Sequence, residues 1–176
     1  LRELPIIPIP LFENLIEIPN FNKRSRKLLL EISSLDWSSV NPDILGSLLQ
    51  SIASPEYSLD LGPQFTSVPN IMKVLCPLFL DDFYEIFENE KTNYSGLLEL
   101  LGRISQVKIF DPSCGSGCFL IIAYKELRLL ESRIINQIKN SFNNNTNLKN
   151  RISLANFCGL DASHFACLVA EIGLCF

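Results

Sequence analysis

The sequence predicts an α/β fold: the start of a doubly wound parallel sheet, preceded by a mainly helical segment. Two observations lead to this prediction. The second half of the chain alternates strand-like and helix-like patterns, and its first strand ends in a glycine-bearing turn just before an amphipathic helix. Parallel strands need a crossover helix between them, so this alternation is typical of such sheets. We therefore expect a helical segment over residues 1–104 and the first two strand–helix units over residues 105–176.

The first segment begins with an extended stretch and continues as helices. Residues 1–20 carry four prolines among Ile and Leu, a pattern that opposes a helix. The basic stretch 23–27 leads into a helix that ends near Leu35. Its charges are more typical of a solvated helix face than of a phosphate contact. Further helices are expected over about 41–53, from near 67 with apolar residues up to Phe79, and over about 96–104. Pro77 should kink or divide the second of these.

The second segment opens with a short strand over 107–110, ended by Asp111-Pro112. Apolar residues then recur at helical spacing from Phe119 to Ile138. The charged residues of this helix, Glu131 among them, are expected on its polar side. An Asn-rich loop over 140–150 and a strand over 155–160 follow.

The last pattern is a helix with apolar residues at i, i+3, i+4, i+7 and i+11. This spacing predicts that one face of the helix is buried. The residues on that face would be Phe165, Leu168, Val169, Ile172 and Phe176.

Composition excludes several classes of function. The formal charge is −4, so the chain has no overall basic footprint for nucleic acid, and any DNA contact must come from a local patch or another part of the protein. Six cysteines without a C-x-x-C pair, together with a single histidine, predict no metal site. Cys158, Cys167 and Cys175 lie among apolar residues and are expected to be buried thiols.

The chain shows neither a signal peptide nor an apolar run of the roughly 18 residues that a membrane helix needs. We therefore expect a cytoplasmic protein without a membrane partner. The chain starts at Leu1 without a methionine and ends inside an apolar helical pattern. On these grounds we expect a fragment of a larger protein.

The turn after the first strand reads Asp-Pro-Ser-Cys-Gly-Ser-Gly-Cys-Phe-Leu over residues 111–120. Gly115 and Gly117 allow strained backbone angles and close approach of a ligand. A dinucleotide site would have a third glycine at the position of Leu120. An acid at Asp111 repels phosphate and suits a cationic ligand. S-adenosylmethionine has no phosphate and carries an ammonium and a sulfonium, so the turn favours this cofactor over NAD.

Asp161 ends the second strand and has two interpretations. In folds of this type an acid at this point hydrogen-bonds the ribose hydroxyls of the cofactor. Alternatively, Asp161 is the N-cap of the helix that follows. The separation from the glycine turn exceeds the usual value of about 20 residues, which weakens the first interpretation.

Residues 111–120 resemble the D-P-x-C-G-S-G-x-F-L signature of adenine-specific DNA methyltransferases of restriction–modification systems. The resemblance is closest to the large single-chain enzymes that join methylase and endonuclease. The order of motifs is similar to that of the gamma group, which implies a Rossmann-like methyltransferase sheet. Other stretches that resemble these enzymes are 36–46, 61–67, 71–82 and 159–161.

The resemblance implies a set of residues that bind S-adenosylmethionine. Phe65 and Thr66 would hold the methionine end, although on sequence alone the start of a helix explains them equally well. Asp161 would take the ribose. The floor and backbone contacts would come from the glycine string, at Asp111, Pro112, Cys114, Gly115, Gly117 and Phe119. Two departures from the family pattern are Gln64-Phe65 in place of His-Tyr, and Asp161 in place of Glu.

The resemblance also implies methylation of the exocyclic amine of adenine in DNA, after the base is flipped out of the duplex. These enzymes use an [NDS]-P-P-[FYW] turn for that step, and this chain contains no Pro-Pro pair. We therefore expect DNA to be bound through parts of the protein outside this chain. Two alternatives stay open: a methyltransferase of protein or RNA, and a non-catalytic remnant or accessory module.

Overall fold

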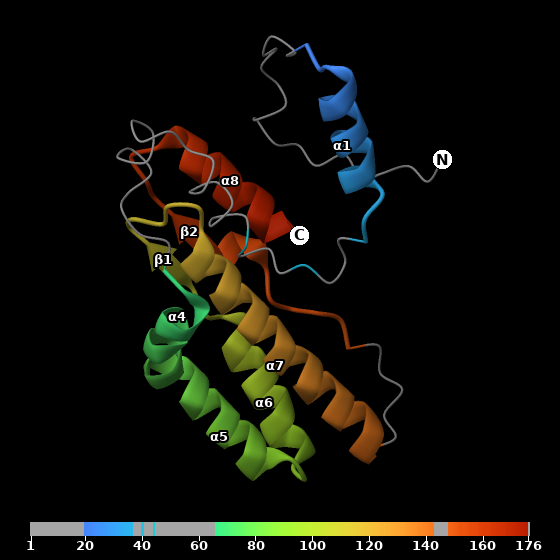
Figure 1. Cartoon of the computed structure of the whole chain (residues 1–176). Coiled ribbons are helices and arrows are strands. Elements are labelled where there is room, and N and C mark those ends of the chain that lie inside the picture. The colour runs from blue at the N-terminus through green and yellow to red at the C-terminus, as the bar shows by residue number, and fades with distance from the viewer. Residues whose placement is uncertain (1–19, 37–39, 41–43, 45–65, 143–147, 176) are drawn as a thin grey trace.

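The computed structural model describes residues 20–36, 40, 44, 66–142 and 148–175 (Figure 1). Most of them are helical. Outside the described residues lie positions 1–19 of the expected extended stretch 1–20, most of the helix expected over 41–53, and Phe65. In chain order, the elements are α1 (Lys23–Ser33), α4 (Val68–Leu75), the π-helix η2 (Cys76–Leu80), α5 (Asp81–Glu90), α6 (Tyr94–Ser105), β1 (Ile109–Asp111), α7 (Cys118–Phe142), the 3₁₀-helix η3 (Leu154–Asn156), β2 (Phe157–Gly159) and α8 (His164–Cys175).

Helix α1 confirms the helix predicted after the basic stretch. The side chain of Asn22 caps it, since its Oδ1 accepts a hydrogen bond of 2.8 Å from the Ser25 amide. The helix contains no buried residue. The Lys27 Nζ lies 3.5 Å from Oε1 of Glu31, one turn further along the helix, and both side chains are exposed. The basic residues of α1 thus lie on a solvated helix surface, as expected.

Pro77 divides the helix predicted from near residue 67, as expected. A proline has no amide hydrogen to donate, and the chain widens into the π-helix η2 at this point. A separate helix, α5, follows and was not predicted from the sequence. Its buried Phe83 and Phe87 face the core, and it packs against α6.

The core lies between helices α4–α6 and one side of α7 (Figure 1). α7 runs for 25 residues along this layer, which confirms the predicted amphipathic helix. The largest fully buried apolar side chains are Ile71, Leu80, Leu97, Leu100, Leu101, Ile104, Leu120, Leu127, Leu130, Ile134 and Ile138.

β1 and β2 pair in parallel, and α7 connects them. Ile109 lies opposite Phe157, and Asp111 lies opposite Gly159. β2 is shorter than predicted because residues 154–156 form a 3₁₀ turn, capped by the side chain of Ser153. The parallel register brings the carboxyl ends of the two strands side by side. The glycine turn and Asp161 both follow directly from these ends.

The buried face of α8 agrees with the prediction at Leu168 and Val169 and differs at the other described positions. Phe165 is 46% exposed, Ile172 is half-buried, and Phe176 lies outside the described residues. Small residues allow α8 to approach α7 closely: a Cβ on Gly173 would lie 2.5 Å from the side chain of Ile121 in α7. The buried residues of α8 are Ala166, Leu168, Val169, Ala170 and Gly173.

Glu131 is fully buried, so its expected place on the polar side of α7 is wrong. Its Oε1 accepts hydrogen bonds from the backbone amides of Arg151 at 2.5 Å and Ile152 at 3.1 Å. Its other oxygen is paired with the Arg128 guanidinium. The carboxylate is buried because it holds the chain that returns from α7 towards β2, and this tertiary role leaves no signature in the helical pattern.

Glu131→Gln is expected to lower the free energy of unfolding by about 2 kcal/mol, since the change weakens a charge-assisted pair and disturbs two backbone hydrogen bonds to the carboxylate, one of them buried. Urea denaturation measures this effect. Glu99→Gln, at an exposed position of α6, serves as the control and should change stability by less than about 0.5 kcal/mol. Equal effects of the two substitutions would contradict the role of Glu131.

Within the described residues, none of the helices is both long enough and apolar enough to cross a membrane.

Candidate functional site

The glycine turn between β1 and α7 depends on two residues with positive φ. Gly115 has φ 52° and Gly117 has φ 80°, values that side-chain-bearing residues rarely adopt. The Gly117 amide donates to the carbonyl of Cys114 at 2.8 Å, and the Gly117 carbonyl accepts from the Ile121 amide at 2.8 Å, in the first turn of α7. The turn therefore reverses the chain within a few residues and leads directly into the helix.

The two glycines have different surroundings. A Cβ on Gly117 would lie 2.6 Å from the Cβ of Ala170 and 3.0 Å from its Cα, so α8 packs directly on this position. A Cβ on Gly115 would meet nothing within 4 Å. Gly117 is thus required for helix packing, whereas Gly115 presents open backbone to any ligand at the end of the sheet.

Asp161 connects this turn to the end of β2. Its Oδ2 accepts a hydrogen bond of 2.9 Å from the Gly115 amide, 46 positions earlier in the chain. Its Oδ1 accepts from the Ser163 amide at 2.9 Å. Backbone hydrogen bonds join the same strand ends, from Leu160 to Asp111 at 2.9 Å and from Cys114 to Leu160 at 3.0 Å. Two of the residues predicted for the site, Gly115 and Asp161, are therefore in direct contact.

The alternative interpretation of Asp161 as the N-cap of the next helix is wrong. α8 begins at His164, and the cap is Ser163, whose Oγ accepts from the Ala166 amide at 3.3 Å. The Asp161 carboxylate, with one oxygen on the Gly115 amide, is directed to the glycine turn instead.

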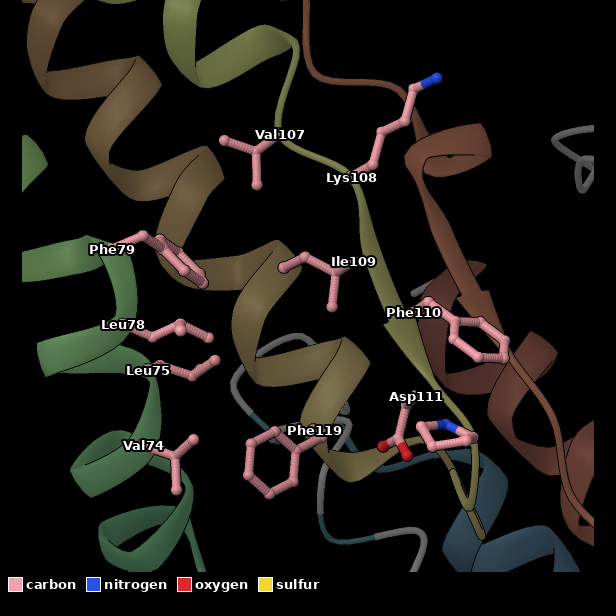
Figure 2. Close-up of a pocket in the computed structure, with 11 residues that line it drawn as sticks. Val74, Leu75, Leu78, Phe79, Val107, Lys108, Ile109, Phe110, Asp111 and Phe119 are labelled. Carbon is pink, nitrogen blue, oxygen red and sulfur yellow. The ribbon is translucent and has the colours of Figure 1, made fainter.

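A cavity of about 500 Å³ lies beside the carboxyl end of β1 (Figure 2). Asp111, Pro112 and Phe119 line it, so three of the residues predicted for the site meet there. Asp111 Oδ1 accepts from the Ser113 amide at 3.0 Å. The remaining walls are residues 107–110, which lead into β1 and begin it, and four side chains of α4 and η2, namely Val74, Leu75, Leu78 and Phe79.

Those four side chains of α4 and η2 were not predicted to belong to a site. In the sequence they read as the apolar face of a helix, a pattern that does not separate core from cavity wall. Val74 and Leu78 are 49% and 67% exposed. Figure 2 shows how Leu75 and Leu78 point towards Ile109 across the cavity. No sequence signal separated the two cases, since Pro77 predicts a break in the helix but not a cavity beside it.

Thr66 is half-buried just before α4, whose N-cap position is taken by Ser67. Thr66 is not among the residues that line the cavity, and Phe65 lies outside the described residues. Of this pair the structure describes Thr66 alone, and it does not place Thr66 among the residues that line the cavity.

Cys114 lies buried beneath the turn, against Gly159 of β2: a Cβ on that glycine would be 2.7 Å from the Cys114 sulfur. Burial, followed by the neighbouring Cys167, Asp111 and Asp161, raises the pKa of the Cys114 thiol to about 11. The thiol is therefore a packing group and stays protonated at neutral pH. Contrary to expectation, Cys158 and Cys175 are exposed.

Cys114 should react with iodoacetamide at pH 8 about 100-fold more slowly than a thiol of ordinary pKa, because its thiolate fraction is lower by that factor. Peptide mass spectrometry after timed alkylation measures the rate, with exposed Cys158 as the internal reference. Because the pKa of Cys114 is higher in the folded protein than in the unfolded chain, the free energy of unfolding depends on pH. The contribution of Cys114 is fully present below the ordinary thiol pKa and is lost as the pH rises towards 11. Equal rates at Cys114 and Cys158 would contradict this assignment.

Among the described residues, no group of three or more His, Cys, Asp or Glu side chains is arranged to hold a metal ion. The absence of a metal site from the chain as a whole stays a prediction.

Comparison with known proteins identifies relatives along the whole chain. Residues 87–176 match the family described as the MmeI DNA-methyltransferase domain. DNA methyltransferase A of Bacillus subtilis is 42% identical over 175 residues, 99% of this chain. A putative type II restriction enzyme and methyltransferase of Methanocaldococcus jannaschii is 28% identical and covers 90% of it.

A solved structure is also similar. The type IIL restriction-modification enzyme MmeI, determined in complex with DNA, superposes with a TM-score of 0.79 at 37% identity over 93% of this chain. The chain spans only 20% and 16% of the two curated relatives and 22% of the MmeI chain. It therefore corresponds to about a fifth of their length.

Proposed function

The chain belongs to the MmeI DNA-methyltransferase domain family, and from this premise we propose that it carries the S-adenosylmethionine site of an adenine-N6 DNA methyltransferase. The observation that supports this most is the 2.9 Å hydrogen bond from the Gly115 amide to Asp161, which joins the turns that follow β1 and β2. Open α/β sheets bind ligands at the carboxyl ends of their strands, where these two turns lie.

Asp161 fits the ribose of the cofactor. A carboxylate offers about four lone-pair positions, and the amides of Gly115 and Ser163 take two of them. The remaining positions can accept hydrogen bonds from two hydroxyl groups. A Cβ at Gly115 would meet nothing within 4 Å. The ligand can therefore approach the Gly115 backbone next to this carboxylate.

The cavity beside Asp111 fits the methionine end of the cofactor. Its walls are mostly apolar and suit a methylene chain, while Asp111 supplies a negative charge for an ammonium or sulfonium group. In this proposal Pro112 and Phe119 shape the cavity, Cys114 and Gly117 form the floor of the turn, and Phe65 and Thr66 close the methionine end. NAD fits less well, because an acid precedes the glycines and buried Leu120 stands where a third glycine would be.

The fold supports the same proposal. β1 with α7 and β2 with α8 would be the first two units of a doubly wound, Rossmann-like sheet over residues 105–176, and residues 1–104 would be a helical segment that contributes α4 and η2 to the cavity wall. When bound, the cofactor supplies the methyl group. The residues of this chain bind and orient it, and the [NDS]-P-P-[FYW] turn and the surface that reads DNA would be supplied from outside this chain.

Nucleoside analysis tests the acceptor. The full-length protein is incubated with duplex DNA and S-adenosylmethionine, and the digested DNA is analysed by mass spectrometry. We expect N6-methyladenine and no methylated cytosine. Methylated cytosine would overturn the adenine assignment, and methyl transfer to RNA or protein but not to DNA would overturn the DNA substrate.

A further inference from the structure

The segment that leads into β2 is held by the side chain of Asn156, which is not part of the proposed S-adenosylmethionine site, called the methyl-donor site below. The Asn156 side-chain amide donates a hydrogen bond of 2.9 Å to the backbone carbonyl of Ser105, 51 positions earlier. Ser105 is the last residue of α6, where carbonyl groups have no partner within the helix. Asn156 directly precedes β2, and Ser105 lies four residues before β1. The contact therefore ties together the starts of the two strands.

The register of β2 needs such a contact. β1 and β2 pair over only three residues each, so the ladder holds the register through few hydrogen bonds. A slip by one residue would turn every side chain of β2 to the other face and displace Asp161 along the strand direction. Asp161 accepts from Gly115 only in the observed register, in which Asp111 lies opposite Gly159.

Among the described residues, two further side-chain contacts hold the same segment but leave the register at the sheet less tightly defined. Glu131 binds the amides of residues 151 and 152, four or more positions before β2. Phe157 packs edge-on against Tyr124, with ring centroids 5.2 Å apart, a contact without a fixed hydrogen-bond partner. Of the three, the bond from Asn156 to Ser105 is the directional one at the start of the strand.

We propose that Asn156 is a positioning residue for the methyl-donor site: its hydrogen bond to the Ser105 carbonyl sets the register of β2 and so places the Asp161 carboxylate on the Gly115 amide. The part of this inference that concerns ligand affinity rests on the proposed function. The part that concerns the hydrogen bond of the Gly115 amide does not depend on the proposed function.

Hydrogen exchange tests the inference without a ligand. Asn156→Asp keeps the shape of the side chain, removes the donor and places a negative charge at the carboxyl end of α6. In the full-length protein we expect the peptide over residues 112–118 to exchange about tenfold faster than in the wild type. Asn136→Asp, on the exposed side of α7, makes the same charge change and should leave this peptide unchanged. Unchanged exchange in both Asn156→Asp and Asn156→Ala would overturn the inference.

A double-mutant cycle separates positioning from simple capping of α6. Asn156→Asp should raise the Kd for S-adenosylmethionine about tenfold in the wild-type background, but less than about twofold in the Asp161→Ala background, since it acts through Asp161. The same factor in both backgrounds would show a general structural effect and overturn the positioning role. Asn156→Ala, which adds no charge, should repeat the pattern if Asn156→Asp does not fold. A wild type that binds no S-adenosylmethionine would refute the proposed function, and the exchange experiment would then decide the role of Asn156.

Discussion

Gly117→Ala is expected to lower the free energy of unfolding by about 3 kcal/mol or more, the largest stability effect that the structure predicts. The added Cβ would lie 2.6 Å from the Cβ of Ala170 and 3.0 Å from its backbone Cα. In addition, the φ of 80° is unfavourable for any residue with a side chain. α8 and the turn cannot both keep their positions, so the cost combines backbone strain with lost packing. Chemical denaturation measures it.

Gly102→Ala is the matched control. Gly102 lies inside α6, and a Cβ there would meet nothing within 4 Å. This substitution should stabilise the protein by up to about 1 kcal/mol, because alanine loses less backbone entropy in a helix. A Gly117→Ala protein as stable as the wild type would contradict the packing of α8 on the glycine turn.

Asp161→Ala is expected to weaken the binding of S-adenosylmethionine by about 100-fold, the largest effect on the proposed function. The substitution removes the acceptor for the ribose hydroxyls and leaves the Gly115 amide without its partner. Each hydrogen bond to a charged group contributes about 1.5–3 kcal/mol, and tenfold in Kd corresponds to about 1.4 kcal/mol. Equilibrium dialysis with labelled cofactor measures the change.

Asp82→Ala, at an exposed position of α5, is the control for the loss of one negative charge and should leave the affinity unchanged. A thermal melt of each variant shows whether it is folded. If a folded Asp161→Ala protein bound the cofactor as tightly as the wild type, Asp161 would have no part in the site.

Patterns that depend on local chemistry were readable from the sequence. The glycine turn could be placed because a short apolar strand, an Asp-Pro pair and two glycines precede an amphipathic helix, and Pro77 marked the division of the second helix. In the sequence, the long separation between Asp161 and the turn counted against a shared site. In the structure the two meet, because β1 and β2 are parallel neighbours whatever the length of the connection.

Features set by tertiary packing could not be read in this way. Glu131 follows the helical spacing of a charged surface residue, yet it is buried, since its partners are backbone amides 20 and 21 positions away. The α8 face was predicted only in part. Leu168 and Val169 are buried as expected, but the close approach to α7 selects Ala and Gly where larger apolar residues were expected. The four side chains of α4 and η2 at the cavity had the pattern of an ordinary core helix.

The most direct test of the central claim is a calorimetric titration of S-adenosylmethionine and NAD into the folded protein. The carboxyl ends of β1 and β2, with Asp111 and Asp161, should bind S-adenosylmethionine at one molecule per chain, with no detectable heat from NAD. A folded protein that takes up no S-adenosylmethionine, or that binds NAD equally well, would contradict the assignment of these strand ends as a methyl-donor site.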